Sequence, residues 1–188
     1  MRSKAELRAQ YLERRRLLTE SEVTLKSAAI SDLVRGLGEF ARPAACLSYV
    51  ASKDNEVDTK PLIQYLLDEG KNVLVPRVAP GGLLTWSRLQ SLDDLEASPY
   101  GILAPRAPRL DTLPQSTAPV LVPGIAFSSS GHRIGYGKGY FDRFLAGHGG
   151  LKIGLAFDIQ ITDLIQPDEH DVALDLIVTE SRIYDCRR

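Results

Sequence analysis

Apolar runs that alternate with a helical pattern constrain the fold of this chain more than any other feature of its sequence. Residues 44–50 have the composition of a buried strand, and residues 58–69 carry apolar side chains at helical spacing before Gly70. Residues 73–78 form a second buried strand by the same criteria. Because parallel strands need a crossover connection and a helix can supply it, this order favours a parallel sheet with right-handed crossovers.

Further apolar runs extend the predicted sheet. The turn at residues 80–82, Pro-Gly-Gly, predicts that residues 83–89 return as an antiparallel strand, on which Trp86 is predicted to be core. Residues 91–119 contain five prolines and are predicted to cross the surface irregularly. Three more strands are predicted at residues 120–122, 153–157 and 176–179, the last of them ending the sheet. The sequence thus predicts an α/β fold in which a central, mainly parallel sheet is flanked by helices.

Two helices are predicted at the N-terminus. In residues 3–18 the apolar residues fall on one stripe, and the adjoining edge carries the cations Lys4, Arg8 and Arg15. This cationic edge is either a solvated face or a surface from which Lys4 and Arg8 reach into a cleft beneath the helix. Thr19 and Glu22 then have the spacing of a capping box, which predicts the start of a second helix.

The composition of the chain limits the functions that it can have. Its 188 residues, 44% of them apolar, suffice for a single domain with a hydrophobic core over residues 1–188. A formal net charge of −1 provides no broad field for nucleic acid or an anionic membrane, and no apolar run is long enough to cross a bilayer. Cys46 and Cys186 lie far apart with no secretory signal before them, so we expect reduced thiols and a cytoplasmic protein. No obligate protein partner is evident.

Residues 131–142, GHRIGYGKGYFD, are the strongest candidate for a binding site. Their four glycines allow unusual backbone angles or close approach to a ligand. Backbone N–H groups with Arg133 and Lys138 among them would form a cradle for phosphates, and three aromatic residues offer surfaces for a heterocycle. The alternative is a flexible surface loop. A change to helical spacing predicts a helix that begins near residues 138–140, and the spacing matches neither of the common nucleotide-binding loops.

Three polar segments follow predicted strands, at residues 52–58, 131–142 and 166–175. In open α/β sheets ligands collect outside the carboxyl ends of the strands. We therefore expect the three segments to contribute to one site.

Longer motifs resemble those of a known family. Residues 122–145 read VPGIAFSSSGHRIGYGKGYFDRFL, which is similar to the pattern VPGxAFDxxGxRLGxGxGYYDRxL. Residues 4–8 form a KxxLR-like start, Glu56 lies in an acid-containing loop after the first strand, and residues 170–180 are similar to HDxxxDxIxTE. In these features the chain resembles the 5-formyltetrahydrofolate cyclo-ligase family. The resemblance implies a Rossmann-like fold of the NagB/RpiA/CoA-transferase type.

The resemblance also implies an activity and a set of site residues. The implied enzyme uses ATP and Mg²⁺ to convert 5-formyltetrahydrofolate into 5,10-methenyltetrahydrofolate, with release of ADP and phosphate. Arg133 and Lys138 match its catalytic phosphate-neutralising residues, and Asp142 and Asp171 match its Mg²⁺ positions. The implied ATP contacts are Lys4, Arg8, Arg133, Ile134, Gly135, Tyr136, Gly137, Lys138, Gly139, Tyr140 and Phe141. The implied folate contacts are Glu56, Tyr136, Gly137, Lys138, Gly139 and Tyr140.

Some residues depart from the family pattern. Ser128 replaces an aspartate, Phe141 replaces a second tyrosine, and Tyr136 stands where arginine or other residues occur. Loss of the acid at position 128 would change the chemistry of the turn or remove a hydrogen bond near the nucleotide. Asp142 could instead be a favourable partner of its helix dipole, and Tyr140 could be ordinary core. Two other functions stay open: a non-catalytic paralogue that binds folate or nucleotide, and a different small-molecule kinase or ligase.

Overall fold

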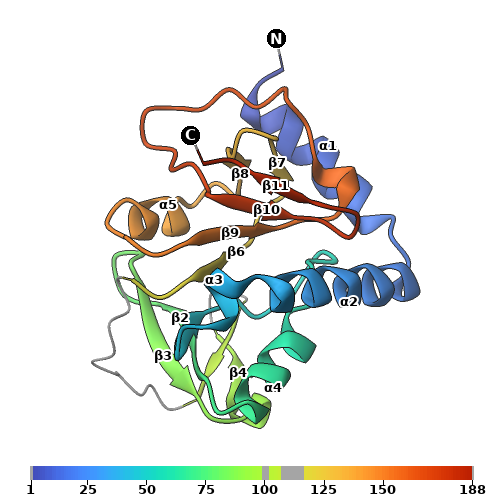
Figure 1. The fold of residues 1–188 in the computed structure, drawn as a ribbon. Coiled ribbons are helices and arrows are strands. Elements are labelled where there is room, and N and C mark those ends of the chain that lie inside the picture. The colour runs from blue at the N-terminus through green and yellow to red at the C-terminus, as the bar shows by residue number, and fades with distance from the viewer. Residues whose placement is uncertain (1, 99–101, 107–116, 188) are drawn as a thin grey trace.

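The computed structural model describes residues 2–98, 102–106 and 117–187. Its centre is a seven-stranded sheet with the order β11-β10-β9-β6-β1-β2-β3 (Figure 1). The strands are β1 (Ala45–Leu47), β2 (Asn72–Val78), β3 (Leu84–Leu89), β6 (Val120–Val122), β9 (Lys152–Leu155), β10 (Leu176–Val178) and β11 (Ile183–Asp185). The five strands from β10 to β2 run parallel, and β3 and β11 form antiparallel edges. The predicted mainly parallel sheet is confirmed.

One edge of the sheet was not predicted. The expectation that residues 176–179 end the sheet is wrong, because β11 pairs with β10 and sets Tyr184 opposite Ile177. Both outer residues of β11 are exposed. A short edge strand of this kind buries too little side chain to show the alternation by which strands are recognised in a sequence.

Helices pack on both faces of the sheet. They are α1 (Lys4–Arg16), α2 (Glu20–Gly36), α3 (Gly38–Ala41), α4 (Lys60–Asp68) and α5 (Tyr140–Leu145), with short 3₁₀ turns η1 (Leu92–Asp94) and η2 (Asp158–Gln160). Alternate residues of β6 face opposite sides: Leu121 joins the core under α2 and α4, whereas Val120 and Val122 join Leu145 of α5. No helix in the described part of the chain is both long and apolar enough to cross a membrane.

Capping boxes begin the two N-terminal helices. The Thr19 hydroxyl accepts a hydrogen bond from the backbone N–H of Glu22, and the Glu22 carboxylate accepts one from the backbone N–H of Thr19 at 2.8 Å. This confirms the predicted start of α2. Ser3 and Glu6 form the same arrangement at the start of α1. Each box satisfies N–H groups that the first turn of a helix leaves without partners.

Two small antiparallel pairs lie outside the main sheet. The strands β7 (Ala126–Phe127) and β8 (Arg133–Ile134) form one, and β4 (Leu95–Ala97) and β5 (Leu103–Pro105) form the other. The prediction of an irregular course for residues 91–119 is therefore wrong where β4 and β5 pair, while residues 99–101 and 107–116 lie outside the described residues. The β5 proline is the terminal residue of a strand, where a missing N–H does not break the ladder.

Gly131, in the turn between β7 and β8, allows no side chain. It has a φ of 92°, and a Cβ there would lie 2.6 Å from the carbonyl oxygen of Leu174. We expect Gly131→Ala to lower the free energy of unfolding by about 2–4 kcal/mol, measured by urea denaturation. Gly36→Ala is the control, because a Cβ at Gly36 meets no heavy atom within 4 Å. Equal stability of the two variants would contradict this account of the turn.

Candidate functional site

A cleft of about 760 Å³ opens where parallel strands end. Its lining includes Tyr49 and Val50, which follow β1, and Pro123, which follows β6. All three predicted polar segments contribute to it. Their cleft residues are Ser52, Lys53 and Glu56 from the first, residues 133–142 from the second, and Asp168 and Asp171 from the third. The chain thus meets the expectation for open α/β sheets.

Every residue predicted for the site from the sequence lines this cleft. They are Lys4, Arg8, Glu56, Arg133, Ile134, Gly135, Tyr136, Gly137, Lys138, Gly139, Tyr140, Phe141, Asp142 and Asp171. The cationic edge of α1 therefore does face a cleft through Lys4 and Arg8. Their neighbour Arg15 differs, because its side chain is buried rather than solvated.

The Gly-rich loop runs from β8 to α5 along the cleft. Gly137 and Gly139 have φ of 88° and 64°, and Gly139 is the residue that precedes the first turn of α5. The predicted helix start near residues 138–140 is confirmed. Arg8 of α1 lies against the loop, where its Nε donates a hydrogen bond to the carbonyl oxygen of Gly135 at 2.8 Å. These contacts fix the loop between α1 and α5, so it is not a slack surface segment.

Arg133 lies beneath the loop and holds Asp142. Its side chain is 3% exposed, and its Nη1 donates to Oδ1 of Asp142 at 2.8 Å. Burial lowers the pKa of the guanidinium, and the neighbouring Asp142 carboxylate opposes that shift. The Nε of Arg133 is buried without a hydrogen-bond partner among the described residues. This arginine thus supplies a fixed positive charge at the floor of the cleft.

Lys4 is paired with two acids from the third polar segment. Its ammonium forms ion pairs with Asp168 and Asp171. Burial tends to lower the pKa of Lys4, but the hydrogen bonds and charges of the two acids raise it above the usual value. Burial likewise opposes ionisation of Asp171, yet its contacts with Lys4 and Asp168 and the charge of Arg133 lower its pKa overall. Both groups are therefore held in their charged forms.

Lys138 differs from the other cations of the cleft. It lines the cleft and is exposed, and within the described residues its ammonium forms no ion pair or hydrogen bond. Its backbone carbonyl accepts a hydrogen bond from Arg143 at 3.1 Å, which fixes the main chain at this point. A lysine on an anchored backbone with a free ammonium can turn towards an incoming anion.

Glu56 lines the cleft from the segment after β1. Its Oε2 accepts a hydrogen bond from the backbone N–H of Ser52 at 3.1 Å. Burial raises the pKa of the Glu56 carboxyl above its usual value. Burial and the charge of Glu56 also raise the pKa of the Tyr136 hydroxyl. The Nζ of Lys53 lies 4.2 Å from the centre of the Tyr136 ring, a cation–π contact that covers one ring face.

Several cleft residues were missed by the sequence reasoning. Lys53 and Asp168 lie within two predicted polar segments, but a surface charge in a loop carries no distinctive pattern. An apolar wall also escaped notice because its residues were assigned to strands and to an irregular segment. This wall consists of Pro76, Val78, Leu84, Ile102 and Leu103. Residues 76, 78 and 84 were predicted to lie on strands but were given no place in a site, and the position of β5 beside β2 could not be predicted from spacing.

Ser128 does not line the cleft. It is 2% exposed, and its hydroxyl accepts a hydrogen bond from the backbone N–H of His132 at 3.1 Å and lies 2.9 Å from Oγ of Ser130. The residue therefore acts on the turn between β7 and β8. A serine in place of the family's aspartate at position 128 was expected either to change the turn or to remove a hydrogen bond near the nucleotide. The geometry supports a change in the turn.

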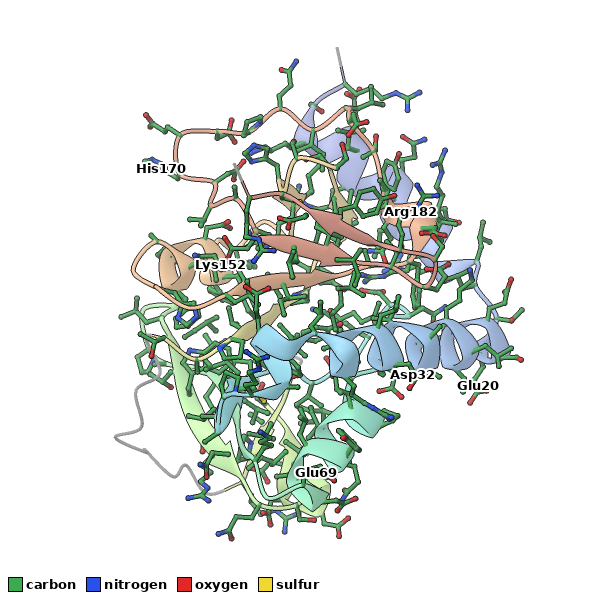
Figure 2. All side chains as sticks on the ribbon, in the orientation of Figure 1. Glu20, Asp32, Glu69, Lys152, His170 and Arg182 are labelled. Atoms are coloured by element: carbon green, nitrogen blue, oxygen red, sulfur yellow. The ribbon has the colours of Figure 1, made fainter. Side chains whose placement is uncertain are left out.

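Aromatic residues near the loop divide between core and cleft. Trp86 is 3% exposed, and its ring centre lies 6.5 Å from that of Phe141 in an edge-on contact, so its predicted place in the core is confirmed. Tyr140 is half-buried at the cleft, with the Arg143 guanidinium 5.5 Å from its ring centre. His170 points outward from the edge of the molecule in Figure 2, with 89% of its side chain exposed.

The carboxylates of the cleft are candidates for binding a metal ion. In the part of the chain that the structure describes, no group of three or more His, Cys, Asp or Glu side chains is arranged to hold one. Asp142 and Asp171 both line the cleft, and each pairs with a cation. Mg²⁺ prefers hard oxygen ligands and is commonly bound by one or two carboxylates together with substrate phosphates and water. The donor set fits an ion that arrives with a nucleotide.

Comparison with known proteins gives consistent matches. The model of the 5-formyltetrahydrofolate cyclo-ligase family matches residues 1–180. The Escherichia coli 5-formyltetrahydrofolate cyclo-ligase is 34% identical over 71% of this chain and 77% of that protein. The Mycolicibacterium smegmatis protein of the same name is 30% identical over 96% of this chain and 95% of its own length. A solved structure of Aquifex aeolicus 5,10-methenyltetrahydrofolate synthetase has a TM-score of 0.83 and 32% identity, covering 98% of this chain and 93% of that one.

Proposed function

This chain belongs to the 5-formyltetrahydrofolate cyclo-ligase family, and we propose that it converts 5-formyltetrahydrofolate into 5,10-methenyltetrahydrofolate at the expense of ATP. One observation carries the proposal. The cleft combines the exposed Lys138 on a Gly-rich loop with the half-buried acid Glu56 and the apolar wall. Phosphate-binding and heterocycle-binding features thus lie within reach of one another.

The chemistry explains why both kinds of feature are needed. The oxygen of a formamide is a poor leaving group, so we propose that the γ-phosphoryl group of ATP is transferred to it, with ADP as the leaving group. N10 of the folate then attacks the activated carbon, and the oxygen departs as part of inorganic phosphate. Phosphoryl transfer of this kind depends mainly on alignment and on neutralisation of charge. Both substrates must therefore lie in the same cleft.

The cations of the cleft would serve the nucleotide. Lys138 would contact the transferred phosphate, and Arg133 would add a fixed charge from beneath. Lys4 and Arg8 would approach from α1 to bind the rest of the triphosphate. Backbone N–H groups of residues 134–141 would complete the phosphate cradle, with Tyr136, Tyr140 and Phe141 beside the nucleotide or folate rings. Mg²⁺, held by Asp142 and Asp171 together with the phosphates, would supply further charge neutralisation.

Glu56 would bind the folate. Its carboxylate can accept hydrogen bonds from the amino and N–H groups of the pterin ring, and the apolar wall can pack against the aromatic part of the substrate. We also propose that the enzyme is cytoplasmic, since Cys46 and Cys186 are both free thiols.

The proposed role of Glu56 predicts a pH dependence. Because the pKa of Glu56 is raised by burial, the ionised form that accepts hydrogen bonds is lost as pH falls through that raised value. We expect the KM for 5-formyltetrahydrofolate to rise about tenfold per pH unit below this pKa. Glu56→Gln should raise the KM at neutral pH and remove this part of its pH dependence. Steady-state kinetics at constant ionic strength measures both. An unchanged pH profile in the variant would assign the titration to the substrate.

A direct assay tests the proposed function. Purified protein with ATP, Mg²⁺ and 5-formyltetrahydrofolate should generate the near-ultraviolet absorbance of the methenyl product, and omission of any one component should prevent it. If no product forms while calorimetry detects folate or ATP binding, the chain is a non-catalytic binding paralogue. Hydrolysis of ATP triggered by another metabolite would instead indicate a different kinase or ligase.

A further inference from the structure

Arg15 of α1 is buried at the junction of three segments that form the cleft. Its side chain is 1% exposed. Its Nε donates a hydrogen bond to the carbonyl oxygen of Asp54 at 2.6 Å, and its Nη1 donates to that of Gly124 at 2.9 Å. Its Nη2 donates to the hydroxyl of Tyr136 at 2.6 Å. One guanidinium therefore joins the segment after β1, the turn after β6 and the Gly-rich loop.

Asn55 makes the reciprocal connection to α1. Its Nδ2 donates hydrogen bonds to the carbonyl oxygens of Leu18 at 2.8 Å and Arg15 at 3.2 Å, just where α1 ends. The last carbonyl groups of a helix have no partners in a following turn. That of Arg15 accepts a hydrogen bond from the backbone N–H of Leu18 at 3.2 Å, and the Asn55 amide adds side-chain contacts to this end of α1. Asn55 has a φ of 52°, and Asp54 before it has a φ of 51°. The residue next to Glu56 is therefore held in an unusual backbone conformation by its contacts with α1.

From these contacts we propose that Arg15 and Asn55 are positioning residues that set Glu56 and Tyr136 at a fixed distance from the nucleotide-binding cations of α1. The inference rests on the proposed function, because it assigns Glu56 to the folate and Lys4 to ATP. Arg15 lies eleven residues after Lys4, about 16 Å along the helix. Because Lys4 and Arg15 both lie on α1, a single rigid helix connects the nucleotide end of the cleft with its folate end.

The planar guanidinium is suited to this task. Its donors have fixed directions, so the three acceptors are held in a defined arrangement that a lysine could not reproduce. The cations at the other end of α1 have separate anchors, since Lys4 pairs with Asp168 and Asp171 and Arg8 binds Gly135. Loss of the Arg15 or Asn55 contacts should therefore disturb the folate end of the cleft more than the nucleotide end.

Asn55→Gly is the decisive variant. Glycine accepts a φ of 52° without strain, so the substitution removes the amide contacts and keeps the backbone conformation possible. We expect the KM for 5-formyltetrahydrofolate to rise about tenfold, as for the loss of buried hydrogen bonds, while the KM for ATP changes less than about twofold. Arg15→Lys, which keeps the charge, should shift the same two constants in the same unequal way.

Arg16→Ala is the matched control. Arg16 also contacts this segment, with its Nη2 2.7 Å from Oδ1 of Asp54, but its side chain is 53% exposed. Such surface pairs contribute little, so we expect both KM values to stay within about twofold of the wild type. A folate KM that is unchanged in Asn55→Gly, or KM values for both substrates that rise equally, would overturn the inference. Should Arg15→Lys fail to fold, the Asn55→Gly result still decides.

The test of the positioning role can be distinguished from the test of the proposed function. Turnover by the wild-type protein tests the function first. If the wild-type protein binds 5-formyltetrahydrofolate without turnover, calorimetric dissociation constants replace KM, and a selective loss of folate affinity in Asn55→Gly supports the positioning role. If the wild-type protein binds neither substrate, the inference is overturned together with the function.

Discussion

Lys138→Ala is expected to lower kcat by about a hundredfold or more while leaving the fold unchanged. Lys138 is exposed and its ammonium has no partner among the described residues, so its removal breaks no internal contact. The charge that develops on a transferred phosphoryl group is neutralised by cations already in place, and a residue that acts mainly in the transition state affects kcat more than KM. Steady-state kinetics at saturating ATP and folate, with a thermal unfolding curve, would measure both effects.

Lys60→Ala is the control for the loss of a lysine. Lys60 is exposed at the start of α4 and does not line the cleft. This variant should retain wild-type kcat. A Lys138→Ala enzyme with wild-type kcat would show that the backbone of the loop and the other cations of the cleft suffice to neutralise the transferred phosphate. It would also remove the proposed catalytic role of Lys138.

Asp142→Asn is the second change with a large expected effect, and it acts on both activity and stability. Asp142 is the ion-pair partner of Arg133, whose side chain is 3% exposed. Loss of one partner leaves a buried charge without compensation, which costs about 3–5 kcal/mol in fully buried pairs and less here because Asp142 is partly exposed. The same substitution removes a proposed Mg²⁺ ligand, so kcat should fall by about a hundredfold.

Magnesium dependence separates the two effects of Asp142→Asn. If the carboxylate binds the ion, a higher Mg²⁺ concentration should restore part of the activity without restoring the melting temperature. Asp32→Asn is the control, because Asp32 on α2 makes a surface ion pair with Arg35 at 3.6 Å and has a side chain that is 71% exposed. Loss of stability with no change in Mg²⁺ dependence would limit Asp142 to the support of Arg133.

Much of the candidate site could be predicted from the sequence because its residues lie close together in the chain. The glycines, Arg133, Lys138 and Asp142 lie within one short segment, and the residues around them are similar over 24 positions to a known pattern, from Val122 to Leu145. The buried parallel strands were equally visible, because strands covered on both faces are continuously apolar. Strand β11 and the β4–β5 pair were missed, since short exposed strands lack that signal.

Contacts between distant segments could not be predicted. Arg15 shares the spacing of Lys4 and Arg8 on a helical edge, and only the packing of α1 against residues 52–58 and the Gly-rich loop shows that it is buried. The partners of Lys4 were also hidden, because Asp168 and Asp171 are more than 160 residues away in the chain. A charged residue looks the same in a sequence whether it meets solvent or an acceptor across the fold.

The anchoring of α1 at both ends restricts how the length of the chain can change during evolution. Insertion of one residue between Lys4 and Arg15 would rotate one end of the helix by about 100° relative to the other. Lys4 and Arg15 could then not reach Asp171 and Tyr136 together. Insertions and deletions should therefore be tolerated in exposed turns such as residues 80–82, while this stretch of α1 keeps a constant length.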